Sequence, residues 1–379
     1  MKRFRRVTAV YLFLSLLLTG CWDIKNIEDV NYFTGIGFDY VDNEYRVYGQ
    51  MIDFSSVAKV ESGKPTQPVP VWVGIGKGET LVGAYNDLYR SSQMRIFYGH
   101  VNAVIVSDSV LKTGLKPVKE LISRYYEIRY TPWIFGTNQP IDKLFSISPM
   151  FNLSSILSLL HQPQETYRQQ SLISPITVRE FISEYREPGN ATLLPSLTTT
   201  AQNWKSDDKA KDMLVIDGIY IFQDQAFCGW LDWKRVLGLR WMNPETHRSP
   251  LLIRTDGKPQ VAVSLESPKP HISPRITMGQ VTFDINVRLS GYISEEFEKL
   301  PESELEQKIA EKVESEIKST FLEGLRVKSD ILRLEHTLYR DNNREWKNLK
   351  SQGGIRLHSG SIGHIKAEIN LNHSGKLKY

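Results

Sequence analysis

The first twenty residues constrain this chain more than any other segment, because they have the layout of an export signal. Four basic and no acidic residues lie in the first six positions, and an almost unbroken apolar run follows over 7–18. A helix rises about 1.5 Å per residue and needs roughly 20 apolar positions to cross a bilayer, so this run is too short to span one comfortably. We therefore predict a signal peptide over 1–20.

The leader ends on Leu18-Thr19-Gly20-Cys21, where small residues are followed at once by a cysteine. This ending resembles the bacterial lipobox, in which the cysteine thiol is diacylglycerylated and the chain is cut so that the cysteine becomes the mature amino terminus. The resemblance predicts that Cys21 carries lipid. The alternatives are a secretory signal cut elsewhere and an uncleaved anchor.

The net charge of +4 belongs to the leader alone. The chain has 47 basic and 43 acidic residues, and setting aside the four basic residues of the leader leaves 43 of each. A nucleic-acid-binding surface needs Lys and Arg in excess and clustered, so composition predicts no nucleic-acid partner. The length of 379 residues exceeds one ordinary core and predicts two or three domains.

Cys228 is the only other cysteine. If Cys21 carries lipid, Cys228 has no intrachain partner, and a disulfide fold, a CxxC redox motif and a cysteine zinc site all fail on count. We expect Cys228 to be a small buried apolar residue on a strand.

The apolar pattern mixes strand and helix spacing without the regular cadence of a parallel wound sheet. It predicts an α+β fold of mixed β-sheets with packed helices, in two to three domains after the lipoprotein signal peptide. The expected strands lie at 32–39, 45–53, 101–106, 213–222, 226–231, 261–265, 281–289 and 362–371. The expected helices lie at 80–89, 117–125, 141–145, 178–185 and 302–325, with a short apolar segment at 133–135 and a loop at 61–70.

Two of these helices carry start signals. Thr80 is placed as the N-cap of 80–89, and Ser303 with Glu306 fits a capping box for 302–325. In the longer helix apolar residues recur at every fourth position, which favours packing against a sheet over a coiled-coil partner helix. This stripe consists of Leu305, Ile309, Val313, Ile317, Phe321 and Leu325.

The stretch over 198–212 is polar, mixed in charge and nearly free of aliphatic residues. Such composition is typical of a connection between domains. The expected division is therefore an N-terminal region at 21–200, as one domain or two, a linker at 201–212 and a C-terminal α+β domain at 213–379.

No catalytic, cofactor or metal site emerges from the residues. Gly74, Gly76 and Gly78 invite a phosphate-loop interpretation, but that motif requires glycine at Val71 and Ser or Thr at position 78. The glycines more simply let a strand turn tightly into the helix at Thr80. The histidines are scattered, with none at HxxxH spacing, and no GxSxG is present. An enzyme is therefore unsupported.

Several short motifs occur in order along the chain. Cys21-Trp22-Asp23 follows the lipobox directly, with an acidic and aliphatic stretch at Ile27 and Glu28. Further motifs are Gly78-Glu79-Thr80-Leu81, Phe97-Tyr98-Gly99-His100, the residues Arg124, Glu127 and Arg129, Leu194-Pro195, Gly218-Ile219-Tyr220-Ile221-Phe222, Gly229-Trp230-Leu231, Ser329-Asp330-Ile331 and Trp346-Lys347. Together they resemble the Ger(x)C family, the C subunits of spore nutrient-germinant receptors. Lys25 and Asn26 depart from its pattern, and 351–363 follows it poorly.

The resemblance implies a noncatalytic lipoprotein on the outer face of the spore inner membrane, assembled with multispanning A and B subunits. It implies no cofactor, and only weak binding of the germinant, if any. His100, Arg124 and Arg129 are expected to be buried hydrogen-bonding residues more than functional ones. The rival classes are a solute-binding lipoprotein of a transporter, with a ligand cleft of its own, and a cell-envelope hydrolase, which turns over wall fragments.

The lipobox yields a direct prediction. Burial of acyl chains stabilises by about 0.8 kcal/mol per CH₂, so two long chains supply on the order of 20 kcal/mol and hold a protein on the membrane. The thioether to the lipid requires sulfur. We expect Cys21→Ala to leave an unlipidated precursor without the lipid-anchored mature form, as followed by fatty-acid labelling. Continued labelling of that variant would contradict the assignment.

Overall fold

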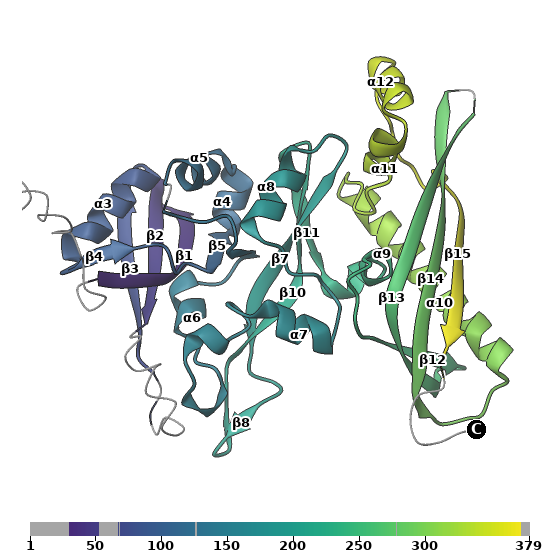
Figure 1. Ribbon diagram of the computed structural model, residues 1–379, viewed down its shortest axis with the longest axis horizontal. Helices are drawn as coiled ribbons and strands as arrows, with labels where there is room; N and C mark the ends of the chain where they lie inside the picture. Colours follow the sequence, from purple (N-terminus) through teal and green to yellow (C-terminus); the bar gives the residue numbers. More distant parts are fainter. Residues whose placement is uncertain (1–29, 53–66, 68, 126, 278, 373–379) are drawn as a thin grey trace, which may run out of the picture.

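The computed structural model describes residues 30–52, 67, 69–125, 127–277 and 279–372. Over these residues the protein is elongated, and two parts lie side by side along its long axis (Figure 1). The first part is built on a nine-stranded sheet and the second on a four-stranded sheet. Helices pack on both sheets, which confirms the predicted α+β class.

The large sheet is mixed. Its strands are β1 (Val30–Val41), β2 (Glu44–Ile52), β3 (Val71–Gly78), β4 (Arg95–Phe97), β5 (Ala103–Ser107), β6 (Trp133–Thr137), β7 (Ala191–Thr200), β10 (Met213–Gln223) and β11 (Ala226–Asp232). They follow the order β11-β10-β7-β6-β5-β1-β2-β3, and β4 pairs with β1. β5 is parallel to β1 and β6, whereas the β1–β2–β3 and β7–β10–β11 segments are antiparallel.

Helices cover both faces of this sheet. One hydrophobic core joins Phe33 and Phe38 of β1 to the four helices α3 (Leu81–Ser91), α4 (Asp108–Thr113), α5 (Lys116–Arg124) and α8 (Val178–Arg186). On the other face, α6 (Ile141–Ser146) packs through Ile141 and Phe145 against Ile105. The predicted elements of this region are therefore present, with shifts of a few residues at their ends.

The glycines of β3 allow α3 to lie directly on the strand. A Cβ atom at Gly76 would lie 2.0 Å from the Ala84 carbonyl oxygen, and one at Gly78 would lie 2.6 Å from the Ala84 nitrogen. Thr80 is the N-cap, as predicted, and its Oγ1 accepts a hydrogen bond from Gly83 N at 3.0 Å. The glycines thus serve close helix packing, beyond the short turn that we predicted from them.

The expected linker at 201–212 is instead the tip of a hairpin within the first part. β7 and β10 flank it and pair antiparallel from Thr200–Met213 onward, and the tip holds the two short strands β8 (Lys205–Ser206) and β9 (Lys209–Ala210). The segment is polar because its residues are exposed at the end of a long hairpin. The chain passes from the first sheet to the second only after β11.

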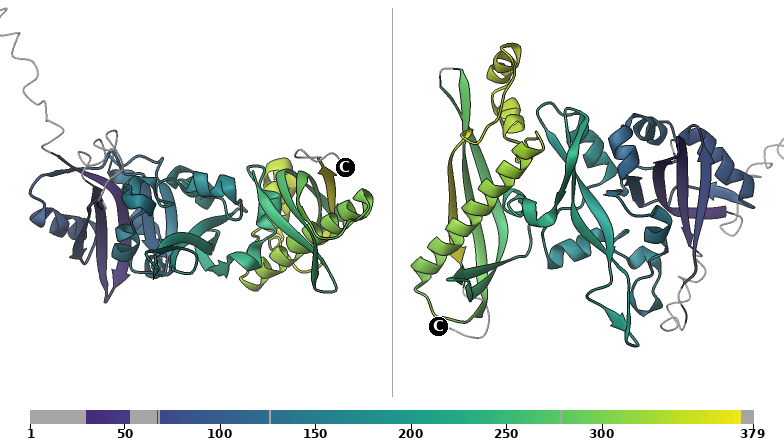
Figure 2. Two further views of the ribbon diagram at one scale, coloured as in Figure 1. Left: turned by 90° about the horizontal axis from the view of Figure 1, so that it is seen from below. Right: turned by 180° about the vertical axis from the view of Figure 1, so that it is seen from behind.

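The second part consists of a twisted sheet and a long helix. The strands β12 (Ser249–Thr255), β13 (Lys258–Thr277), β14 (Gln280–Glu296) and β15 (Ile362–Leu371) are hydrogen-bonded in that order. Helix α10 (Glu302–Arg326) crosses one face of this sheet (Figure 2, right). The predicted stripe from Leu305 to Phe321 is buried there, and Leu325 is half-buried.

The predicted capping box of α10 is wrong. The helix begins at Glu302, its N-cap is Pro301, and no side chain caps it. Ser303 already lies inside the first turn, so its hydroxyl cannot occupy the N-cap position.

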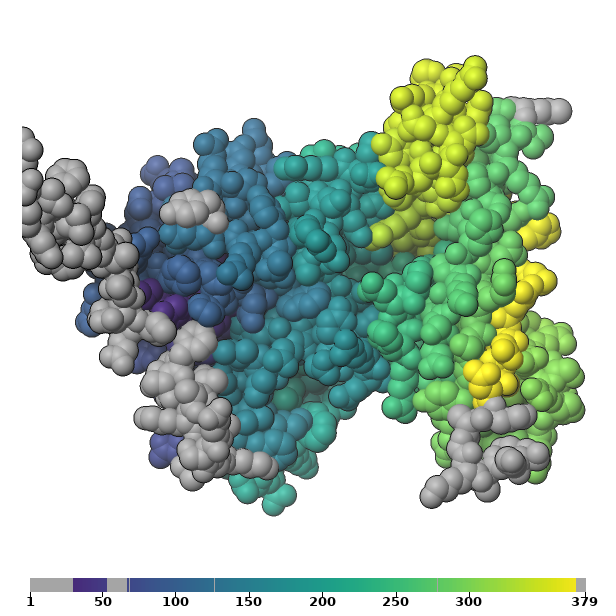
Figure 3. Space-filling model, viewed as in Figure 1, coloured from purple at the N-terminus to yellow at the C-terminus, as the bar shows by residue number. Residues whose placement is uncertain are grey.

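Polar contacts join the two parts, which touch along their junction (Figure 3). Glu184 on α8 pairs with Arg333, just before α11 (Leu334–Asp341), with Oε2 and Nη2 2.8 Å apart. At the end of β10, Gln223 Oε1 accepts hydrogen bonds from Ser329 Oγ and Asp330 N, each at 3.2 Å. Burial raises the pKa of Asp330 to about 7. The junction also contains an apolar cluster, in which Ile219 and Ile221 of β10 pack with Ile331 of the second part.

The hairpin tip at 201–212 predicts a specific outcome of limited proteolysis. The exposed hairpin tip buries little apolar surface, so mild proteolysis should cut first between 201 and 211. Because β7 and β10 remain paired, we expect the two fragments to stay together in native size-exclusion chromatography and to separate only in denaturant. Fragments that part under native conditions would show that the hairpin does not bridge the cut.

Candidate functional site

Cys21 and the motif residues Trp22, Asp23, Ile27 and Glu28 lie outside the described residues. The lipidation of Cys21 therefore stays a prediction. Among the helices that the structure describes, none combines the length and the apolar character needed to cross a membrane.

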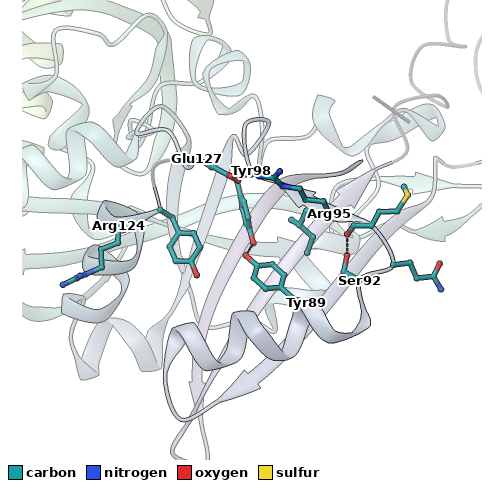
Figure 4. Close-up of a pocket in the computed structure, with 10 residues that line it drawn as sticks. Tyr89, Ser92, Arg95, Tyr98, Arg124 and Glu127 are labelled. Carbon is teal, nitrogen blue, oxygen red and sulfur yellow. Dashed lines mark hydrogen bonds and ion pairs between the residues drawn. The ribbon is translucent and has the colours of Figure 1, made fainter. Parts of the chain in front are cut away.

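A pocket of about 670 Å³ opens in the first part, between α3, β4 and the end of α5 (Figure 4). Aromatic and polar side chains alternate around it. The lining residues are Tyr89, Ser92, Gln93, Met94, Arg95, Ile96, Tyr98, Arg124, Tyr125 and Glu127. Pockets of this size, with an aromatic wall and a few polar groups, are typical of small-molecule sites.

Three tyrosines, Tyr89, Tyr98 and Tyr125, line this pocket, and the buried ring of Tyr85 packs behind them. Tyr85 stacks on Tyr125 with ring centroids 5.5 Å apart, and the hydroxyls of Tyr89 and Tyr98 are hydrogen-bonded to each other. The buried Tyr85 hydroxyl has no hydrogen-bond partner within the described chain. Burial raises the pKa of Tyr85, Tyr89 and Tyr98 above the ordinary value. These phenols therefore stay protonated at neutral pH and can donate hydrogen bonds, but they are poor nucleophiles and bases.

The rim of the pocket carries charge. Arg95 Nη2 lies 3.3 Å from Glu127 Oε1, and Arg124 points away from the tyrosines toward solvent (Figure 4). No metal-binding group of three His, Cys, Asp or Glu side chains occurs among the residues described. The arrangement is suited to binding, because it offers donors and aromatic faces without an activated nucleophile.

The expectation that His100, Arg124 and Arg129 are buried is wrong. All three side chains are exposed. His100 lies at the surface in edge contacts with Tyr32 and Phe97, with ring centroids 5.0 and 6.1 Å apart. Only Arg124 reaches the pocket. The sequence could not show this, since each of the three follows a loop or a helix end whose direction depends on tertiary packing.

Among the described residues, His161 is the buried histidine, and no sequence pattern indicated it. Its Nε2 lies 2.8 Å from Gln50 Oε1, and its Nδ1 contacts Asn102 Oδ1; with the imidazole proton on Nε2, the Asn102 amide has to turn its NH₂ group toward Nδ1. Gln50 Nε2 donates to Phe145 O at 2.8 Å, which fixes Gln50 Oε1 as the acceptor and places the imidazole proton on Nε2. Burial lowers the pKa of His161 to about 3. This neutral histidine links Gln50 on β2 to Asn102 just before β5, while Gln50 itself bonds to α6, and the network is structural.

Two other features lie outside the pocket. A second cavity of about 720 Å³ lies at the junction of the two parts, and Glu184, Arg240 and Arg333 are among its lining residues. Cys228 lies on β11 as expected, but it is half-buried rather than buried. Burial raises the pKa of its thiol, so it is not an activated nucleophile.

Comparison with known sequences assigns the class of protein. Residues 23–199 match the family described as "Spore germination protein N-terminal domain", and residues 217–375 match "Spore germination B3/ GerAC like, C-terminal". These matches cover most of the chain. The protein therefore belongs to this family of spore germination proteins, as the sequence motifs indicated.

Individual proteins of known sequence or structure are similar to this chain over most of its length. The spore germination protein KC of Bacillus subtilis (strain 168) is 23% identical over 401 residues, covering 97% of this chain and 95% of that protein. The spore germination protein B3 of the same organism is 20% identical over 293 residues, covering 76% and 74%. The crystal structure of the GerBC protein superimposes with a TM-score of 0.51 at 14% identity, covering 90% of this chain and 97% of that one. This likeness establishes the shared fold.

The His161 network predicts a pH dependence of stability. An unfolded chain binds a proton on this imidazole below a pKa of about 6.5, whereas the folded chain resists protonation down to about 3. Stability is therefore complete above about pH 6.5 and is lost as the pH falls toward 3. Between pH 7 and 5 the loss amounts to about 2 kcal/mol.

We expect His161→Gln to remove this contribution. Urea unfolding of the wild type and the variant at pH 7 and pH 5 would measure it, and the pH-dependent loss should be smaller in the variant by about 2 kcal/mol. His271→Gln, on the exposed surface of β13, is the matched control and should behave like the wild type. Equal pH dependence in all three proteins would contradict the assignment.

Proposed function

We propose that this chain is a membrane-anchored, noncatalytic lipoprotein subunit of a spore nutrient germinant receptor, required for receptor assembly and for the germination response. The observation that carries the proposal is the family match over both halves of the chain, together with the nearly full-length similarity to a spore germination protein. In this proposal Cys21 is the lipid-bearing residue, and the protein lies on the outer face of the spore inner membrane.

The chemistry of the described residues supports a noncatalytic role. The pocket tyrosines hold their protons, the thiol of Cys228 has a raised pKa, and His161 is committed to a structural network. None of these groups stands beside a second group that would activate it for acid, base or nucleophilic chemistry. Binding and assembly remain as the functions that the site can perform.

The charge balance supports protein partners over lipid electrostatics. Beyond the leader the basic and acidic residues are equal in number, so no polybasic excess is available to hold the chain on anionic lipid. A lipid anchor would confine the chain to a thin layer and raise its effective concentration near integral neighbours. The proposed partners are the multispanning A and B subunits of the same receptor.

The tyrosine-walled pocket favours a second candidate function, that of a solute-binding lipoprotein. Its volume of about 670 Å³ and the protonated phenols of Tyr89 and Tyr98 on its wall suit a small ligand. Calorimetry distinguishes the two, because a solute binder should form a tight one-to-one complex by itself. Under the receptor proposal we expect weak binding of germinant amino acids or sugars, or none, by the chain in isolation.

The receptor proposal predicts a specific deletion phenotype. Removing the chain should abolish the response of its receptor to nutrients and leave germination by receptor-independent routes intact, as followed by germination assays on purified spores. Tagged protein from detergent-solubilised membranes should bring down two multispanning partners. An unchanged nutrient response, or co-purification with transporter subunits instead, would contradict the proposal.

A further inference from the structure

Sheet edges are places where unpaired backbone groups can recruit another strand, and most edges of this protein are closed. On β15 the outward amides of Ala367 and Leu371 donate to Glu314 and Glu306 of α10, at 2.9 and 3.2 Å. Two carboxylates of α10 therefore accept the hydrogen bonds that these edge N–H groups could otherwise donate to another strand.

The edges β12 and β11 are closed by other means. β12 carries Pro250, which has no N–H, and a register shift between Ile253 and Arg254. The pairing between β10 and β11 shifts register between Ile221 and Phe222 of β10. On β11, Gly229 has a φ of +152°. Such irregularities twist an edge away from further pairing.

Apart from the three-residue strand β4, the remaining edge strand of the two larger sheets is β3, and within the described part of the chain its edge is open over most of its length. It is a regular strand of eight residues without proline, and its pairing with β2 shows no register shift. The side chain of Trp72 is 68% exposed and that of Ile75 is 44% exposed. Large apolar side chains on other strands at sheet edges are less exposed, at 38% each for Phe97 on β4, Trp230 on β11 and Ile276 on β13. Apolar exposure on a regular edge favours pairing with another strand.

The register identifies which backbone groups of β3 face outward. The two-residue turn at Asp42 and Asn43 makes Val41 and Glu44 the last hydrogen-bonded pair of β1 and β2. Even-numbered residues of β2 therefore bond to β1, and odd-numbered ones bond to the even-numbered residues of β3. The odd-numbered residues of β3 are left with their N–H and C=O groups at the free edge.

A second observation agrees with this assignment. Lys77 N donates to Asp87 Oδ2 of α3 at 3.0 Å, so its amide is directed away from β2. Asp87 thereby closes the Lys77 end of the edge. The open amides are those of Val71, Val73 and Ile75.

We propose that β3 pairs antiparallel with β3 of a second copy of this chain, with Val73 opposite Val73 and Val71 opposite Ile75. In this register every open amide of both strands is used, and the ladder ends where Asp87 occupies the Lys77 amide. The arrangement is two-fold symmetric, as isologous interfaces require.

The side chains fit the same register. Trp72 of one copy lies opposite Gly74 of the other, where Leu88 of α3 covers the glycine and offers an apolar contact to the indole ring. On the opposite face, β-branched residues meet at Val71–Ile75 and Val73–Val73. The self-complementarity of the strand favours a second copy over an extended segment of another protein as the occupant. The inference goes beyond the proposed receptor role and does not depend on it.

Cysteine cross-linking of the full-length chain in membranes tests the register. In a Cys228→Ser background, Val73→Cys places the two sulfurs across a pair whose Cα atoms are about 5.5 Å apart, within disulfide range. Ile75→Cys is the matched control, because the two Ile75 positions would lie more than about 10 Å apart. We expect a disulfide-linked dimer with Val73→Cys and none with Ile75→Cys.

Backbone variants test the edge itself. Val73→Pro removes an outward N–H that makes no bond to any residue that the structure describes, so it should preserve the fold but give monomers in detergent-solubilised samples measured by light scattering. Val73→Thr keeps the N–H and should remain dimeric. The proposal would be overturned by a disulfide-linked dimer of the Ile75→Cys variant, or by the absence of any linkage in the Val73→Cys variant. Linkage to a different protein, or dimers that persist in the Val73→Pro variant, would also overturn it.

Discussion

The placement of the two parts depends on one buried carboxylate. Glu316 of α10 accepts hydrogen bonds from Arg240 Nη2 at 2.9 Å and from Trp241 Nε1 at 2.8 Å, with both charged side chains less than a tenth exposed. Arg240 and Trp241 belong to α9 (Leu239–Met242), the connection between the two sheets. Removal of Glu316 would leave Arg240 buried without a charged partner, and removal of Arg240 would leave Glu316 with only Lys312, 3.9 Å away. Breaking a buried pair in this way typically costs about 3–5 kcal/mol. The connection is therefore fixed to the core of the second part before it reaches β12.

The same connection is also fixed to the first part. Ser171 N donates to Arg248 O at 2.7 Å, and Ser249 Oγ donates to Ser171 O at 3.0 Å. With the contacts of Glu184 and Gln223, this gives a junction in which directional bonds surround the apolar cluster of Ile219, Ile221 and Ile331. The directional bonds favour one orientation, because each bond is lost if the parts rotate.

Local sequence patterns predicted most helices and strands well. They did not predict which distant segments pack together. The alternation in 281–289 and the stripe of α10 report burial directly, so β14 and α10 were predictable. The polar run at 201–212 reports exposure only, and both a linker and a hairpin tip are exposed. The family matches end at 199 and resume at 217, although β7 and β10 pair across that interval. His161, the tyrosine wall and the open edge of β3 each depend on contacts between distant segments, which spacing along the chain does not encode.

The features that suit recognition gather in the first part. β1 begins at Val30, which pairs with Arg95 on the rim of the tyrosine pocket, and the open edge lies one strand beyond β2 in the same sheet. Val30 lies nine positions after Cys21, and nine residue steps span at most about 30 Å when extended. If Cys21 is anchored as proposed, the start of β1 and the nearby pocket rim lie within that distance of the bilayer surface, where contact with integral subunits is possible. The second part, whose outer edges are closed, would then present a surface that does not recruit further strands.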